Sequence, residues 1–187
     1  MRTWMIILLT LIVITTDAQT EKKRPALLPD HAKAQFAGTI GFIAIGAGYD
    51  WSKGKLEGDL YYGYVPSWVG GVDIHSLTAK LTWLPLKREY NNDIVVDWLN
   101  AGFLINYAFG RRYHLFSRTN YSFVYYGFPT AAHIALFLGG GVSKKKIGLY
   151  YEIGTTDRDL ASYATNSKAI PFTDIINIGI GARLRLH

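Results

Sequence analysis

The chain has 187 residues, 49% of them hydrophobic and 14% aromatic, which excludes a disordered or collagen-like protein and fits one domain with a sizeable core. It has no cysteine, which excludes a disulfide framework, thiol catalysis and cysteine metal sites. The net charge of +6 raises the question of nucleic acid, but the basic residues are scattered or fall in short runs such as EKKR and SKKK. Such runs are typical of solvated turns, or of turns that face anionic lipid headgroups or periplasmic components.

The N-terminus has the pattern of an export signal. Arg2 is followed by an apolar stretch from Trp4 to Ile14 and by the small-residue site TDA, which predicts a secretory signal peptide cleaved before Gln19. A transmembrane anchor is the alternative, although a spanning helix needs roughly 18 or more apolar residues. The next stretch, QTEKKRPALLPDHAK, is polar and contains proline. The expected organisation is a signal peptide at 1–18, a polar periplasmic leader at 19–34 and a barrel domain at 35–187.

From Gln35 onward, apolar and polar residues alternate along the chain. In KIGLYYEIG, residues 146–154, isoleucine, leucine and tyrosine on one face alternate with glycine, tyrosine and Glu152 on the other. This period of two predicts β-strands, and no helical period of convincing length lies between them. We expect about eight strands, at Phe36–Trp51, Lys55–Val65, Ile74–Leu84, Trp98–Phe109, Phe116–Tyr126, Ala132–Val142, Lys146–Gly154 and Thr173–Leu186.

These strands predict a single antiparallel β-barrel of the all-β class, since closure leaves no unpaired edge. Aromatic residues gather near the strand ends on the apolar face, and glycines and short polar side chains dominate the other face. That pattern is typical of a transmembrane β-barrel in the outer membrane of a Gram-negative cell. The segments are also as long as a tilted strand needs to be to cross a bilayer. A secreted soluble barrel or sandwich, with the apolar face inward, is the alternative.

In a membrane barrel the polar face lines the lumen. We therefore expect Glu152 to belong to a polar lumen network. If the second and third predicted strands pair across VPSWVGGVD, Asp59 lies close to Lys80, and pairing lowers the cost of burying either charge. The predicted lumen network consists of Glu57, Asp59, Lys80, Glu152, Arg183 and Arg185.

The segment YYGYVPSWVGGVDIHSLTAKLTWLP, preceded by GAGYDWSKGKLEGDL, resembles the eight-stranded outer-membrane barrels of the lipid A deacylase superfamily and similar Bacteroidetes barrels. The resemblance implies a site like that of a serine hydrolase, with a His-any-Ser pair on the next-to-last strand and an acid on the last. The corresponding segment here, YEIGTTD at Tyr151–Asp157, contains neither histidine nor serine. Asp174 corresponds to the acid, but it has no histidine to orient. The resemblance therefore implies the fold and assigns no catalytic residue.

Other candidate sites are weaker. His75 and Ser76 are adjacent, so in a strand they point to opposite faces and cannot act as base and nucleophile. A rebuilt site at the outer mouth is the remaining catalytic hypothesis, made of His133, Asp157 or Asp174, and Ser162. The histidines show no metal-ligand spacing, so neither a metal nor another cofactor is expected.

The leading expectation is a non-enzymatic outer-membrane barrel with a polar, largely closed lumen and loops that bind a partner or surface ligand. Its expected partners are outer-membrane lipid and, through extracellular loops, another envelope protein; nucleic acid is not expected. One alternative is an envelope lipid hydrolase. The other is a narrow pore for small solutes, although the interior of an eight-stranded barrel is just wide enough for side chains to fill.

Overall fold

The structure, a computed structural model, describes residues 28–90, 93–109 and 131–186. The predicted signal peptide, most of the leader and the predicted strand at 116–126 lie outside these residues. None of the helices in the described ranges is long and apolar enough to cross a membrane.

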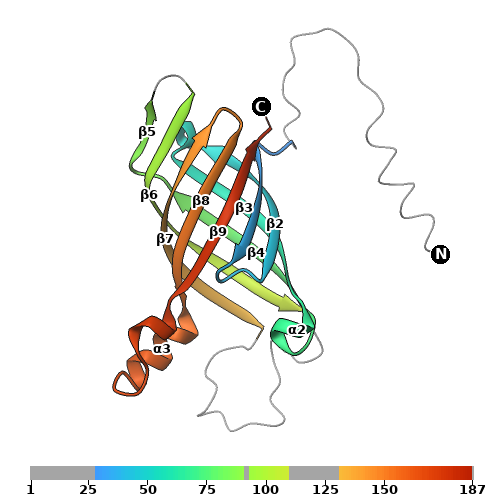
Figure 1. Ribbon diagram of the computed structural model, residues 1–187, viewed down its shortest axis with the longest axis vertical. Helices are drawn as coiled ribbons and strands as arrows, with labels where there is room; N and C mark the ends of the chain where they lie inside the picture. The colour runs from blue at the N-terminus through green and yellow to red at the C-terminus, as the bar shows by residue number, and fades with distance from the viewer. Residues whose placement is uncertain (1–27, 91–92, 110–130, 187) are drawn as a thin grey trace, which may run out of the picture.

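Nine antiparallel strands form one sheet (Figure 1). They are β1 (His31–Ala37), β2 (Ile43–Trp51), β3 (Leu56–Val65), β4 (Ile74–Trp83), β5 (Lys87–Tyr90), β6 (Ile94–Phe109), β7 (Ala132–Lys144), β8 (Ile147–Thr156) and β9 (Asn177–Arg185). Pairing of β1 with β9 and of β4 with β6 closes eight of them into a barrel. The remaining strand, β5, lies outside the closed barrel and pairs only with the first residues of β6. The expected all-β class and eight-stranded antiparallel barrel are confirmed.

The two ends of the barrel differ (Figure 1). At the terminal end, where β1 begins and β9 ends, the connections are short and include the 3-10 turn η1 (Ser52–Gly54). At the helical end lie α2 (Ser67–Gly70), α3 (Asp157–Thr165) and the 3-10 turn η2 (Phe172–Ile175). Thr156 caps α3, because its hydroxyl accepts a hydrogen bond from the Asp159 amide at 3.1 Å. β9 starts at Asn177, four residues later than the predicted strand Thr173–Leu186, because η2 occupies Phe172–Ile175.

The predicted strand Phe36–Trp51 is wrong, because the structure divides this region into β1 and β2. The chain reverses at Ala37 and Gly38, whose φ angles are 59° and 83°. Glycine adopts this left-handed conformation at little cost, so a tight turn forms there. β1 starts at His31, so the barrel begins earlier than the expected boundary at Gln35. The eight strands of the barrel include this extra strand, and all eight lie within the described residues.

A β-bulge shifts the alternation in β6. The register with β7 changes between Asp97 and Asn100, so that both of these side chains are buried although they are three positions apart. Trp98 and Leu99, between them, are both exposed. A bulge places two residues of one strand opposite one of its partner, which reverses the faces beyond it.

The outward face of the barrel is apolar. Large aliphatic and aromatic side chains are exposed on every strand of the closed barrel, including Ile45, Leu60, Leu77, Phe103, Leu138, Leu149 and Ile180. The inward face carries the buried polar and charged side chains. In a water-soluble protein the apolar face normally points inward, so this barrel has the reverse arrangement.

Candidate functional site in the barrel lumen

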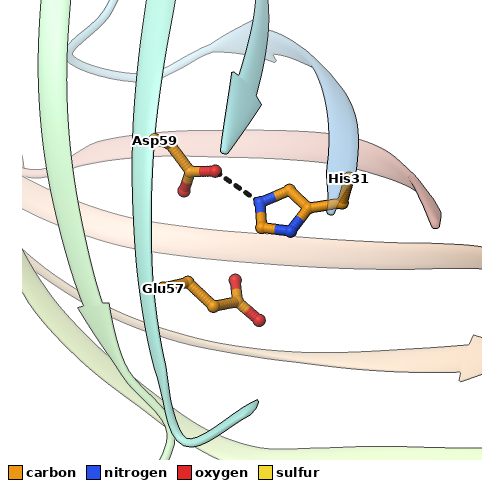
Figure 2. Close-up of side chains that lie close together, drawn as sticks. All are labelled: His31, Glu57 and Asp59. Atoms are coloured by element: carbon orange, nitrogen blue, oxygen red, sulfur yellow. Dashed lines mark hydrogen bonds and ion pairs between the residues drawn. The ribbon is translucent and has the colours of Figure 1, made fainter. Parts of the chain in front are cut away.

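A cluster of charged side chains fills the lumen near the terminal end. β3 contributes Glu57 and Asp59, β1 contributes His31 and Lys33, and β9 contributes Arg183; all five are buried. The alternation of each strand aims these residues inward. Figure 2 shows His31, Glu57 and Asp59 converging in the interior.

His31 lies between two carboxylates. Its Nε2 is 2.6 Å from Oδ1 of Asp59, and its Nδ1 is 2.9 Å from Oδ1 of Asp50. The Nε2 contact is a hydrogen bond, and the Nδ1 contact has the distance of an ion pair, so the imidazole is held between the two carboxylates. His31 therefore ties the first strand to both β2 and β3.

Lys33 and Arg183 hold the acids of β3. The Lys33 ammonium donates to Oε2 of Glu57 at 2.8 Å and to Oδ2 of Asp59 at 2.7 Å. Arg183 donates to the same Glu57 oxygen. Hydrogen bonds between charged groups are about twice as strong as neutral ones, so this cluster links the first, third and last strands of the barrel.

A second group lies deeper in the lumen. Lys80 donates to Glu152 and reaches Oε1 of Gln35 at 3.5 Å. The same Gln35 oxygen accepts from the Tyr150 hydroxyl at 3.1 Å, and this hydroxyl is 3.2 Å from that of Tyr61. The Lys80 ammonium also lies near three aromatic rings, including that of Phe137 at 4.5 Å from the ring centre, within the reach of a cation–π interaction.

The buried charges balance when His31 is protonated. Among the described residues, four buried acids face three buried cations and His31, which is the fourth cation when it is protonated. A neutral total lowers the cost of taking these groups out of water, since unpaired buried ions are strongly destabilising. The acids are Glu57, Asp59, Asp97 and Glu152, and the cations are Lys33, Lys80 and Arg183.

His31, Glu57 and Asp59 form the one group that could offer three metal ligands in the described part of the chain, with ligand atoms within 4.8 Å of one another. Most of their donor atoms are engaged, however, although Oε1 of Glu57 has no hydrogen-bond partner. Lys33 lies between the two carboxylates and Arg183 binds Glu57. A divalent cation would have to displace one ammonium and approach another cation, so the chemistry of this cluster fits internal ion pairing better than metal binding.

Aromatic rings close the middle of the lumen. The rings of Tyr61, Tyr150 and Phe137 each cover a glycine on the neighbouring strand. A Cβ added at Gly46 would lie 2.6 Å from the Tyr61 ring, and one added at Gly181 would lie 2.2 Å from that of Tyr150. These glycines thus leave room for large side chains to lie flat across the interior.

Among the described residues, the buried side chains in the half of the lumen nearer the helical end are uncharged. Its buried apolar residues include Ile40, which enters from the turn between β1 and β2, together with Leu104 and Phe137. The polar groups there form neutral hydrogen bonds. Ser76 donates to the Ile40 carbonyl at 3.1 Å, and Asn106 donates to the Thr78 hydroxyl at 2.9 Å.

The predicted lumen residues are placed as follows. Glu57, Asp59, Lys80, Glu152 and Arg183 are buried in the interior, whereas Arg185, at the end of β9, is partly exposed. Asp59 and Lys80 are opposite each other in the register of β3 and β4. They do not form the expected ion pair, because Asp59 is bound by Lys33 and His31 while Lys80 binds Glu152.

Sequence reasoning missed four lumen residues. His31, Lys33 and Gln35 were assigned to the leader or to its boundary, although HAKAQFA alternates with a period of two. That alternation was the signal that could have identified β1. Asp97 was missed because the bulge in β6 reverses the period on which the assignment depends.

The weak catalytic candidates are only partly brought together at the helical end. His133 Nδ1 lies 3.6 Å from Oδ1 of Asp157. Ser162 is exposed on α3, and Asp174 is exposed in η2, where its carboxylate accepts from the Thr173 hydroxyl at 3.3 Å. His75 is exposed and Ser76 is buried, as expected for neighbours in a strand. No described contact joins Ser162 to His133, so this geometry supplies no activated nucleophile.

Comparison of the chain with protein-family models, curated proteins and solved structures finds no match. The resemblance to lipid A deacylase barrels therefore remains a matter of the quoted sequence segments. What the structure has in common with outer-membrane barrels is the fold, a closed eight-stranded antiparallel barrel with an apolar outer wall and a charged interior.

Proposed function

We propose that this protein is a non-enzymatic outer-membrane β-barrel whose lumen is closed and whose loops at the helical end bind a partner or surface ligand. The observation that carries the proposal is the reversed arrangement of its faces. A closed barrel with exposed aliphatic or aromatic side chains on every strand and buried ion pairs inside is suited to lipid outside and not to water.

The distribution of aromatic residues supports the same proposal. Trp51, Trp83 and Trp98 are exposed near the terminal end, and Tyr62 and Phe109 are exposed near the helical end. Aromatic side chains collect at the two interfaces of a bilayer because one part of the ring system is apolar and the other polar. The aliphatic side chains between these two groups would face the hydrocarbon region.

The filled lumen argues against the alternative of a pore. The Tyr61, Tyr150 and Phe137 rings and the Lys80–Glu152 pair occupy the middle of the barrel. Ile40 and Leu104 fill the half beyond them. A small solute would have to break buried ion pairs to pass, which costs several kcal/mol for each ion left without a partner (order of magnitude).

The helical end offers the surfaces through which a partner would bind. Trp68 in α2 has 76% of its surface exposed, and Leu160 in α3 and Phe172 in η2 are also exposed. Aromatic side chains that are accessible in this way are common anchors of protein interfaces. A photo-reactive amino acid at Leu160 should therefore crosslink to an envelope component, and one at Lys53, at the opposite end, should not give the same product.

The test of the membrane assignment is fractionation of cells that express the protein. It should be recovered with outer membranes, resist carbonate extraction and migrate differently on a gel when the sample is not heated. Recovery in the soluble periplasmic or secreted fraction would refute the proposal.

A pair of substitutions tests the same assignment on the folded protein. Leu138 lies in the middle of β7 and Leu86 at the terminal end, and they are similarly exposed, at 57% and 52%. In a bilayer, Leu138→Lys should destabilise by about 2–4 kcal/mol and Leu86→Lys by at most about 1 kcal/mol. In a water-soluble barrel both changes would be close to neutral, and that outcome in lipid would contradict the assignment.

The hydrolase alternative has a direct test of its own. Since no described residue offers a nucleophile in contact with His133, we expect lipid A from cells with and without this protein to carry the same acyl chains by mass spectrometry. Loss of an acyl chain only in the presence of the protein would overturn this expectation, and His133→Ala would then show whether the rim histidine is required.

A further inference from the structure

A groove of ≈ 770 Å³ runs along the outer wall over β1 and its neighbours β2 and β9 and reaches β3, β4 and β8. Its volume lies within the roughly 300–1,000 Å³ that is usual for ligand sites. Alanines form its floor: Ala32 and Ala34 of β1, Ala47 of β2 and Ala182 of β9. Bulkier side chains form its sides: Ile45, Leu60, Tyr62, Leu77, Ile147 and Leu184.

The register brings the alanines together. Ala32 pairs with Ala47 on one side, and Ala34 pairs with Ala182 on the other. Side chains that face outward in paired positions are direct neighbours on the sheet surface. On their other sides Ala32 pairs with Leu184 and Ala34 pairs with Ile45, so the alanines form a diagonal from Ala47 across β1 to Ala182, and the apolar wall has a trough along it.

Cations lie where this trough reaches the terminal end. Ile147 and Leu184 line the trough, and the residues next to them are Lys146 and Arg185. The two main chains are joined there, because the Arg185 amide donates to the Lys146 carbonyl at 2.7 Å. By the alternation of β9 the Arg185 side chain is on the lumen side, whereas Lys146 is exposed. Lys144 and Lys145 are exposed in the same turn. The nearby acid Asp30 is partly exposed and accepts a hydrogen bond from the Asp50 amide at 2.9 Å.

We propose that this trough binds one acyl chain of an anionic phospholipid, whose phosphate lies against Lys146 and its turn neighbours Lys144 and Lys145. The inference rests on the proposed position of the barrel in a bilayer. An apolar trough that ends at a cluster of cations matches an amphiphile with a chain and an anionic headgroup. A second copy of the chain would place its own apolar wall on the trough but would bring nothing anionic to these cations, which is why we favour the lipid.

The headgroup preference has an expected size. Lysine and arginine near an anionic membrane surface contribute about 1 kcal/mol each, which corresponds to roughly fivefold in affinity. Lys146→Gln should therefore reduce the preference for phosphatidylglycerol over phosphatidylcholine about fivefold. Arg88→Gln is the matched control, because Arg88 is exposed on β5, on the opposite side of the barrel from β1.

The experiment is native mass spectrometry of the protein released from nanodiscs that contain equal amounts of the two phospholipids. We expect one retained phosphatidylglycerol for each protein. Ala34→Phe, which fills the trough, should abolish this retention. Ala79→Phe is its control, since Ala79 is an exposed outward alanine of β4 that does not line the trough.

Each outcome bears on a separate claim. Failure of the protein to enter nanodiscs would refute the proposed function. Entry with equal retention of the two lipids, or with retention unchanged by Ala34→Phe, would overturn the lipid site alone. A dimer that Ala34→Phe dissociates would also overturn it and would identify a second copy as the occupant.

Discussion

In the half of the lumen nearer the terminal end the buried side chains are mostly charged, whereas in the half nearer the helical end they are apolar or neutral. The charged half contains His31, Lys33 and Arg183 around the carboxylates of β3. The neutral half contains Leu104, Phe137 and Ile40. Both halves fill the barrel, but only the first depends on every member being present, because removal of one ion leaves another buried without a partner.

The difference shows how one barrel combines a specific strand register with tolerance of substitutions in its core. An apolar core loses stability in proportion to the volume removed and accepts many shapes. A buried ion network accepts few, since each charge needs a particular partner at a particular place. The charged half should therefore determine the register of the strands, and the neutral half should supply packing.

The largest effect is expected at Glu57, which accepts from both Lys33 and Arg183. Glu57→Leu should destabilise the barrel by about 4 kcal/mol, because it leaves two buried cations short of a partner. Urea unfolding of the detergent-folded protein, followed by gel mobility, measures the change. A loss no greater than that of a surface substitution such as Lys53→Ala would show that this half is not the sensitive one.

In the neutral half, Leu104→Ala should cost about 3 kcal/mol through the cavity that it leaves. Leu104→Met, which nearly conserves volume, should cost less than about 1.5 kcal/mol. The same unfolding assay compares the two variants. If the methionine variant were as unstable as the alanine variant, packing in this half would be as demanding as ion pairing in the other.

A double-mutant cycle tests the boundary between the halves. Lys80→Met and Glu152→Leu should each destabilise by roughly 3 kcal/mol, and the double variant should recover about 2 kcal/mol of the summed loss. Lys80→Met combined with Asp59→Leu is the comparison, since these residues face each other in the register without an ion pair. Equal coupling energies in the two cycles would contradict the pairing described here.

A smaller effect is expected for Ser76, whose hydroxyl holds the Ile40 carbonyl over the neutral half. Ser76→Ala should cost about 1 kcal/mol, the usual contribution of a neutral hydrogen bond. Thr78→Val is a control for loss of a hydroxyl deeper in the same half. Unfolding midpoints in urea measure both changes. A loss above about 3 kcal/mol for Ser76→Ala would be as large as the loss of a buried ion pair, and it would contradict the claim that the charged half is the more sensitive one.

The smallest effect concerns a carboxylate outside both halves, at the helical end. A hydrogen bond from the Tyr64 hydroxyl, at 2.9 Å, and one from the Ser67 amide hold the pKa of the Asp73 carboxyl below its ordinary value. These bonds favour the folded state above the ordinary pKa of a carboxyl, and the contribution is lost as the pH falls through the lower folded pKa. Tyr64→Phe should raise the Asp73 pKa in an NMR titration. No change would show that this contact is absent in solution.

Much of the barrel could be predicted from the sequence because strand alternation is a local property. The faces of β3 and β4 and the register that sets Asp59 opposite Lys80 follow from a period of two and one hairpin. The ion pairs could not be predicted in this way. Lys80 meets Glu152 across the lumen, 72 positions along the chain, and only closure of the barrel brings them together. β1 was missed because its polar residues resemble those of a leader, and Asp97 was missed because a bulge interrupts the period.

The pairing of Arg183 with Glu57 has a consequence for how the barrel assembles. Arg183 lies on β9 and Glu57 on β3, and two strands, β2 and β1, stand between them in the sheet. Glu57 cannot meet its arginine until the chain's final strand has arrived beside its first. Closure of the barrel and pairing of Arg183 with Glu57 thus occur together. An open sheet would retain these charges without partners, so we expect no stable open intermediate.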